Sequence, residues 1–541
     1  MNDWVIDHVL SAIILLPGLA AFLMMIFNAL ISWLNPAWSL PERLWWWGAL
    51  IATGTVFGLA FSELFFGFDP EAFGPQRVEV NSWISVGGVL WFVGVDGISL
   101  FLVLLTTATV PWVLLTARRQ LQRDPRSFVF CVLLSETGVL GVFLALDAAL
   151  LLLAWQLTLL PLFLILGRWG GPRRARAAIR FSIAWGLGSM LILWALGVVS
   201  TGDSLALYGL PGLEEVGLLE RGGFQGDTVS QGWVLAALLL GLALTIPIFP
   251  LHAWFSDVDR EAPLALSLFL NAVGLKIGTY LLMRLVIPLC PDALESVQVE
   301  LLFCAGIVMV YAFLLMSAQD DFRRLVAWWT LAQLALISVG IFSMEVRGLT
   351  GAVMAMMSHG FTSIALFLLI EDIFERRKTL ALSELGGLAR PMPVFSFFLA
   401  VVVFCAMGLP PLIGFIGQLM IFLGSNSIHW GIGFLILVGW GIGSGGLARF
   451  YRRIALGPVS QPENRGLIDL RFRERLSLFL VLIPIVWIGI APGPLLRRIE
   501  PSVLELLRFV EVESVDRAIF SRRDRANIQN RPDEAGRRRP V

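Results

Sequence analysis

A long series of apolar runs, each of roughly 20 residues, constrains this sequence more than any other feature. In hydrocarbon every backbone N–H and C=O must be paired internally, so a run of this length is expected to cross a bilayer as a helix. Because 57% of the 541 residues are hydrophobic and only 15% are charged, a soluble fold is excluded. We predict an all-α polytopic membrane protein with about fourteen transmembrane helices. Their predicted positions are 5–34, 44–66, 95–117, 127–145, 148–168, 176–200, 231–255, 262–287, 299–317, 323–345, 349–374, 392–424, 427–449 and 477–494.

The connecting loops alternate in charge. Those after odd-numbered segments collect arginine, beginning with Arg118 and Arg119, whereas the long loops on the other side are acidic, with Asp69 in one and Glu214 in another. The positive-inside rule therefore places the basic loops in the cytoplasm and both termini on the non-cytoplasmic side of a bacterial inner (or thylakoid-type) membrane. The tail at 495–541 is rich in arginine, which by the same rule would favour the cytoplasmic side. A late segment has little influence on a topology set by earlier helices, so we predict that the tail is a weakly ordered surface segment.

Two of the predicted helices are interrupted by proline pairs. Pro247 and Pro250 interrupt the seventh segment, and Pro410 and Pro411 interrupt the twelfth. Proline removes a backbone donor and breaks a helix, and paired breaks in corresponding positions indicate two inverted repeats with a central site, although proline is also common in membrane helices. The predicted units are helices 1–3, the five-helix repeats 4–8 and 9–13, helix 14 and a polar tail. In residues these are 1–126, 127–287, 299–453, 477–494 and 495–541.

Few ionisable residues lie inside the apolar runs, and these are the candidate proton carriers. Lys276, His359 and Glu136 can each gain and lose a proton, which makes an intramembrane position a functional hypothesis. For Glu136 the alternative is a structural hydrogen bond to a neighbouring hydroxyl. His252 follows the break at Pro250 and is expected to hold the broken helix rather than to shuttle protons.

Other acids lie near the ends of predicted segments. Glu371 and Asp372 end the eleventh segment beside a basic ERRK run, and we predict a solvated surface pair there. Asp257, Asp259 and Glu261 follow the seventh segment, where we expect them to pack the loop.

Motifs for metals, clusters and nucleotides do not occur in the sequence. The four cysteines stand alone in apolar runs without CxxC spacing, which argues against zinc and iron–sulfur sites. Neither a GxxxxGK[ST] motif nor a GxGxxG motif after a strand occurs. We therefore predict no cofactor, no metal and no nucleic-acid partner for this chain.

Seven motifs between Asp96 and Arg453 resemble those of a known family. They are GVDGISL at 94–100, LLPLFLILGRWGGPRRARAAIRF at 159–181, LTIPIFPLHAWFSDVDREAPLALSLFLNAVGLK at 244–276, AQDDFRRLVAW at 318–328, SHGFTSIALFLL at 358–369, SELGGLARPMP at 383–393 and GLPPLIGFIGQ at 408–418. On these the chain resembles the antiporter-like proton-channel subunits of respiratory complex I, of the NADH dehydrogenase subunit 4 (NuoM, NdhD) type. The resemblance implies a fourteen-helix fold with two inverted repeats, other membrane-arm subunits as partners, and no redox centre in this chain.

The resemblance also implies a proton relay, and this chain departs from it. In the family the relay runs through a glutamate in helix 5, lysines in helices 7 and 8, histidines farther along and a lysine or glutamate in helix 12. Here Lys276 and His359 remain. Residues that do not titrate fill four other family positions, namely Gln156, Thr245, Gln333 and Gln418.

Three functions fit these observations. The first is a membrane-arm subunit of a complex I-like NADH/quinone (or ferredoxin/quinone) oxidoreductase, with an impaired or rerouted proton path. The second is a working translocator that uses Glu136, Lys276 and His359 by another route. The third is a cation/proton antiporter-type or inorganic-carbon-uptake membrane subunit with the same fold.

Overall fold

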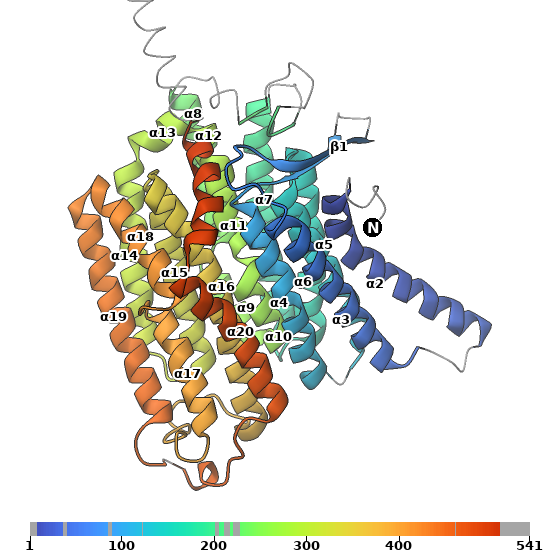
Figure 1. Cartoon of the computed structure of the whole chain (residues 1–541), viewed down its shortest axis with the longest axis vertical. Helices are drawn as coiled ribbons and strands as arrows, with labels where there is room; N and C mark the ends of the chain where they lie inside the picture. The colour runs from blue at the N-terminus through green and yellow to red at the C-terminus, as the bar shows by residue number, and fades with distance from the viewer. Residues whose placement is uncertain are drawn as a thin grey trace, which may run out of the picture.

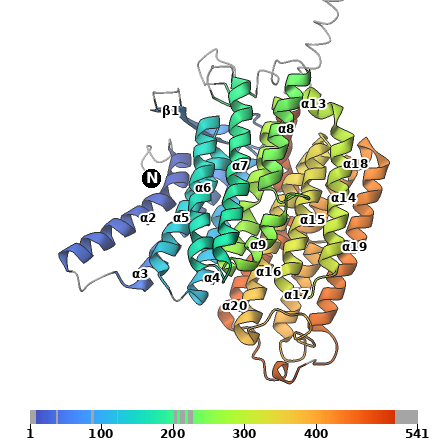
Figure 2. The same ribbon diagram turned by 180° about the vertical axis from the view of Figure 1, so that it is seen from behind.

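The computed structural model describes residues 8–35, 40–84, 89–121, 123–200, 205–209, 217–219, 228–459 and 461–508. Long helices lie side by side in one bundle, with α2 and α3 at one flank and α19 at the other (Figure 1), and the view from behind shows the same order (Figure 2). The α-helices are α2 Val9–Leu34, α3 Glu42–Leu59, α4 Ser99–Gln120, α5 Pro125–Leu144, α6 Ala148–Trp169, α7 Arg174–Ser200, α8 Thr228–Thr245, α9 Ala253–Glu261, α10 Leu264–Phe269, α11 Lys276–Leu281, α12 Ile287–Leu289, α13 Pro291–Ser296, α14 Gln298–Ser317, α15 Phe322–Phe342, α16 Val346–Arg377, α17 Pro393–Ala406, α18 Ile413–Ile428, α19 Trp430–Ala455 and α20 Phe472–Ile490. Shorter helical pieces are the π-helical segments Ala60–Phe65, Leu270–Gly274 and Leu282–Val286 and the 3₁₀ turn Pro462–Asn464.

The prediction of a polytopic helical membrane fold is confirmed. Among the described residues, eleven helices are long and apolar enough to cross a membrane, and a twelfth span arises if α20 is joined to Gly493–Arg508 across a 72° bend. All fourteen predicted segments fall on helices. The seventh and twelfth segments, however, lie on shorter apolar helices, so the count of fourteen stays a prediction.

Both proline pairs lie where a helix stops and another begins. Helix α8 ends at Thr245, and the chain turns through 246–252 before α9 starts. Helix α17 ends at Ala406, and α18 begins after a second turn at 407–412. Each turn contains one cis peptide bond before proline, at Pro250 and at Pro411. The inverted relation between the two predicted five-helix units stays a prediction.

A two-stranded antiparallel hairpin was missed by the sequence analysis. Strand β1 is Gln76–Ile84 and β2 is Val89–Val95, with Val80 opposite Phe92. The carboxylate of Glu79 accepts the backbone N–H of Leu10 at 2.7 Å, which fastens the hairpin to the start of α2. Side chains along β1 alternate between polar and apolar, so a search for continuous apolar runs does not detect it.

The central helices are buried on every side, which positions the site. In the apolar span Leu264–Leu289 and in α16, the most apolar stretch is entirely buried within the chain. In the flanking helices α2, α14 and α19 only 39% of the corresponding stretch is buried, as expected for helices that face lipid. A charged side chain within these fully buried stretches therefore depends on other groups of the protein for its partners.

Candidate functional site

Lys276 lies in the middle of an interrupted helix. The span Leu264–Leu289 consists of α10, a π-helical segment, α11, a second π-helical segment and α12. π-Helical turns inside α-helices occur frequently at functional sites. Lys276 is the first residue of α11 and is fully buried. Its Nζ donates to the backbone carbonyl of Asn271 and lies 2.5 Å from Nδ1 of His359 in α16.

Neighbouring side chains join this contact into a closed cluster. Nε2 of His359 lies 3.2 Å from Oγ1 of Thr330 in α15. The Thr330 hydroxyl donates to Oδ1 of Asn271 at 2.7 Å, and Nδ2 of Asn271 donates to the backbone carbonyl of Ser267 at 2.8 Å. Trp329 stacks on the imidazole with ring centroids 4.7 Å apart. Lys276 of α11 and Thr330 of α15 therefore hold His359 from its two ring nitrogens.

The Lys276–His359 pair has no acidic partner in the part of the chain that the structure describes. A second cationic residue in the same span, Arg284, does have an acidic partner. It is equally buried, and its guanidinium lies 2.8 Å from the carboxylate of Asp96. A buried charge without a partner is expensive, and two like charges in contact are more so. The lysine and the histidine therefore carry at most one positive charge between them.

Glu136 is the other titratable candidate in the membrane. It lies in α5, is fully buried, and has no hydrogen-bond partner for either carboxylate oxygen among the described residues. The neighbouring hydroxyls of Ser135 and Thr137 bond elsewhere, to the carbonyl of Cys131 and the N–H of Gly18. Among the described residues, therefore, no structural hydrogen bond joins Glu136 to a neighbouring hydroxyl. Helix α5 packs beside α11, and a route from Glu136 to Lys276 stays a prediction.

The first two non-titrating positions, Gln156 and Thr245, belong to the first predicted repeat. Gln156 of α6 is exposed on the surface of the chain, and its amide donates to Oγ of Ser189 in α7 at 2.8 Å. Thr245 is fully buried at the end of α8, and its hydroxyl donates to the carbonyl of Gly241 at 3.1 Å. Both side chains are satisfied locally without carrying charge.

The other two non-titrating positions belong to the second predicted repeat. Gln333 is buried in α15, with an Nε2 that has no partner among the described residues. Gln418 of α18 reaches back to the break, where a Cβ on Gly408 would lie only 2.1 Å from its Oε1. Gly408 also has a φ of +71°, so this turn requires glycine. Of all the predicted proton-path residues, the structure brings only Lys276 and His359 into direct contact.

His252 packs against the break before α9. Its imidazole centroid lies 5.6 Å from that of Phe249 and 5.4 Å from the ring of Trp328. The side chain of His252 is partly buried. This environment agrees with the predicted role of holding the broken helix.

The three acids after the seventh segment lie in α9 and pack as predicted. Asp257 pairs with Arg180, and Glu261 accepts a backbone N–H from the loop after α6 at 2.8 Å. Asp259 is buried with its carboxylate 3.6 Å from the guanidinium of Arg323. Burial raises the pKa of the Asp259 carboxyl, and Arg323 opposes that rise.

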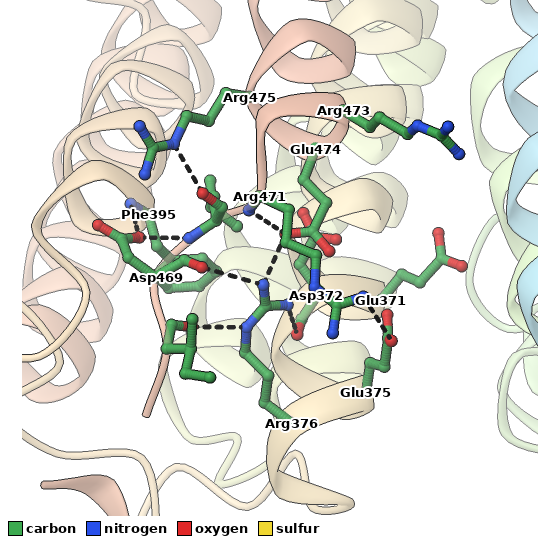
Figure 3. Close-up of polar contacts among 12 residues, drawn as sticks. Glu371, Asp372, Glu375, Arg376, Phe395, Asp469, Arg471, Arg473, Glu474 and Arg475 are labelled. Carbon is green, nitrogen blue, oxygen red and sulfur yellow. Dashed lines mark hydrogen bonds and ion pairs between the residues drawn. The ribbon is translucent and has the colours of Figure 1, made fainter. Parts of the chain in front are cut away.

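A buried charge cluster occupies the end of α16 next to α20 (Figure 3). The prediction that Glu371 and Asp372 form a solvated surface pair is wrong, because they are only 3% and 1% exposed. Arg119 of α4 lies 3.2 Å from the Asp372 carboxylate, and Arg376 donates to Glu474 at 2.6 Å. Helices α4 and α20 cover this end of α16, although the adjacent ERRK run suggested a surface.

Sequence reasoning missed Asn271 and Thr330. The available signal was a polar residue inside an otherwise apolar run, since Asn271 precedes Lys276 by five positions. What the sequence does not contain is the pairing itself, because Thr330 is 59 residues away and belongs to another helix.

Comparison with known proteins assigns the fold and the family. The family model described as "NADH:quinone oxidoreductase/Mrp antiporter, TM" matches residues 145–443. NADH-quinone oxidoreductase subunit M of Rhodobacter capsulatus is 31% identical over 85% of this chain and 90% of its own length. NAD(P)H-quinone oxidoreductase chain 4 2 of Synechococcus sp. (strain JA-3-3Ab) is 32% identical over 84% of this chain and 85% of its own. A chain of respiratory complex I from Thermus thermophilus with bound NADH superposes with a TM-score of 0.80 and 25% identity, covering 93% of this chain and 99% of that one.

These matches extend through both predicted repeats and over most of the length of the relatives. The chain belongs to the NADH:quinone oxidoreductase/Mrp antiporter transmembrane family.

Proposed function

We propose that this chain is a membrane-arm subunit of a complex I-like NADH/quinone or ferredoxin/quinone oxidoreductase, and that its own proton path is impaired. Relatives with quinone oxidoreductase names that span most of the chain support the first part. Its partners are then the other membrane-arm subunits, its redox chemistry lies outside this chain, and both termini face the non-cytoplasmic side.

The single observation that carries the second part is the isolation of the Lys276–His359 pair. The two groups carry at most one positive charge in a fully buried cluster, with no carboxylate among their described contacts. A relay needs titratable groups on both sides of such a pair. The chain supplies amides and a hydroxyl instead, at Gln156, Thr245 and Gln333, which cannot take up and release protons near neutral pH.

Proton pumping by the intact oxidoreductase in proteoliposomes tests this proposal. Restoring titratable groups with Gln156→Glu together with Thr245→Lys is expected to raise the number of protons moved per electron pair, with the quinone reduction rate as the internal control. Wild-type stoichiometry equal to that of the double variant, combined with a loss of pumping in Lys276→Met, would contradict an impaired path. The double variant lies outside the Lys276–His359 contact, so a packing defect at that contact does not explain its result.

Glu136 favours a second candidate, a rerouted path. A fully buried carboxyl without a hydrogen-bond partner is a costly group to retain, and it lies on a helix that packs beside α11. In this candidate Glu136→Gln, which keeps the shape and removes the exchangeable proton, reduces the proton stoichiometry. Under the impaired-path proposal the same substitution leaves the stoichiometry unchanged.

A further inference from the structure

We infer that Asn271 is a positioning residue that fixes which ring nitrogen of His359 carries a hydrogen, and that it thereby confines proton exchange to the Lys276 side of the ring. The inference deepens the proposed function and rests on it for its biological meaning, because it explains how the central pair can hold a proton without passing it on. It follows from the direction of each hydrogen bond in the cluster.

The orientation of the Asn271 amide is set by the backbone. The carbonyl of Ser267 can only accept, so the amide atom 2.8 Å from it must be the nitrogen. Oδ1 of Asn271 therefore faces the opposite way, toward α15. A flipped amide would place two acceptors against each other at Ser267.

The anchoring carbonyl is itself held in place. The Ser267 hydroxyl accepts a hydrogen bond from Arg323 at 2.6 Å, and the same guanidinium donates to the carbonyl of Ala262 at 2.6 Å. Arg323 also lies beside the carboxylate of Asp259. The start of α10, where the Asn271 amide is fastened, is therefore tied to α15.

The Asn271 amide then fixes the Thr330 hydroxyl. Oδ1 of Asn271 is an acceptor 2.7 Å from Oγ1 of Thr330, and a hydroxyl has only one hydrogen to give. With that hydrogen directed to Asn271, the Thr330 oxygen presents only lone pairs to Nε2 of His359, 3.2 Å away. Nε2 must therefore carry a hydrogen and donate it.

When the pair carries one positive charge, two protonation states satisfy these directions. In one, Lys276 is an ammonium that donates from Nζ to the bare Nδ1 of a neutral His359. In the other, the proton has moved from Nζ to Nδ1, leaving a neutral amine that accepts from an imidazolium. One N–H bond breaks and one forms, and the net charge is unchanged. The hydrogen on Nε2 is the same in both states.

The far side of the ring is therefore closed to proton transfer. Release of the Nε2 hydrogen would require Thr330 to pass its own hydrogen to the Asn271 amide oxygen, which is far too weak a base to accept it. The arm His359–Thr330–Asn271–Ser267 ends in a backbone carbonyl and leads no farther. His359 can take a proton from Lys276 and return it to Lys276.

Histidine-selective ¹⁵N labelling makes this arrangement measurable, because the chain has four histidines. Solid-state ¹⁵N spectra of the full chain in bilayers distinguish the two neutral tautomers from the imidazolium, and His359→Gln assigns the signal. Lys276 by itself favours a bare Nδ1, so the measurement is made in Lys276→Met, where only the Thr330–Asn271 arm selects the tautomer. We expect the Nε2-H form alone in Lys276→Met, and both tautomers in Lys276→Met with Asn271→Ala.

Two further variants keep the result interpretable. Lys276→Met with Thr330→Val removes the arm at its other link, and a tautomer mixture is expected there too, so the inference does not depend on how Asn271→Ala folds. Lys276→Met with Asn464→Ala removes another fully buried asparagine, whose amide donates to the carbonyl of Glu384 at 2.9 Å, and must keep the Nε2-H form.

A mixture of tautomers already present in Lys276→Met, or a single tautomer that persists in the Asn271→Ala and Thr330→Val backgrounds, would overturn the inference. The spectra report the ring nitrogens directly and do not depend on pumping. A failed pumping test with the expected spectra would refute only the proposed function. The expected pumping results with a tautomer pattern that differs from the expected one would refute only the role of Asn271.

Discussion

Replacing the two members of the central pair is expected to have very unequal effects on stability. His359→Leu leaves the Lys276 ammonium in a dry core with one backbone carbonyl as its described partner, whereas Lys276→Met removes the buried charge. Breaking a buried charged contact from one side costs about 3–5 kcal/mol. Lys276→Met removes the buried charge but leaves Nδ1 of His359 without its partner, so its net effect should be close to zero. The histidine variant should therefore be the far less stable of the two.

The geometry explains why the two effects are coupled. Two positive charges 2.5 Å apart would repel by about 7 kcal/mol even at an effective dielectric constant of about 20, so His359 is neutral whenever Lys276 is charged. Its Nδ1 is then the acceptor that lets the ammonium remain buried. In the double variant Lys276→Met with His359→Leu no charge is left, and the cost should fall below about 1.5 kcal/mol, as for apolar swaps of conserved volume.

The free energy of unfolding of the full chain in detergent micelles, followed by tryptophan fluorescence during an SDS titration, provides the measurement. The expected coupling between the two substitutions is about 3 kcal/mol. Single-variant effects that add to within about 0.5 kcal/mol in the double variant would refute the reasoning, because they would show that the two groups do not depend on each other.

Three further substitutions test other parts of the fold by the same titration. Asp147 caps α6 through the N–H of Leu150 at 2.9 Å, and burial raises its pKa from 3.8 to about 6. The folded state thus binds the proton more tightly, so stability should fall by about 3 kcal/mol as the pH rises from about 4 to 7, and Asp147→Asn, which retains the cap, should abolish that fall. Arg119→Met leaves Glu371 and Asp372 buried without their cation and should cost about 3–5 kcal/mol, against less than about 0.5 kcal/mol for Arg324→Met at an exposed position; equal costs would contradict burial of the acids. Gly408→Ala should cost more than about 1 kcal/mol, because it combines a positive φ with a clash against Gln418, and a neutral effect would contradict this turn geometry.

The fold was predictable where one physical constraint acts along the chain. Bilayer thickness sets the length of an apolar run, which is why helices such as α4 and α14 lie close to their predicted segments. Proline chemistry is equally local, and the turns at Pro250 and Pro411 lie within the two segments predicted to be interrupted. The hairpin was missed because β1 alternates polar and apolar residues outside the apolar runs. The π-helical turns beside Lys276 were not predicted, because no apolar run length or proline position marks them in the sequence.

The site was predictable only as a set of candidates, because its contacts join distant segments. Lys276 and His359 stood out as ionisable residues in apolar runs, but 83 positions separate them and nothing in the sequence states that they touch. Glu371 was misjudged for the same reason, since the residue that neutralises it, Arg119, belongs to a helix far earlier in the chain. Local composition indicates where a charged residue is unusual. Only the packing of the helices shows which residue from another part of the chain pairs with it.

The two buried cations of the central span show why the lysine can be kept without an acid. Arg284 holds its proton permanently, so its place in the core depends on the carboxylate of Asp96. Lys276 is an amine whose proton can move to a neighbouring base, and the base beside it is an imidazole with its acceptor nitrogen turned toward the lysine. An arginine at 276 could not pass its proton to the imidazole. It would need an acidic partner that the described contacts of the site do not provide. The cluster is therefore built for a group that titrates, and the Asn271 arm limits that titration to exchange within the pair.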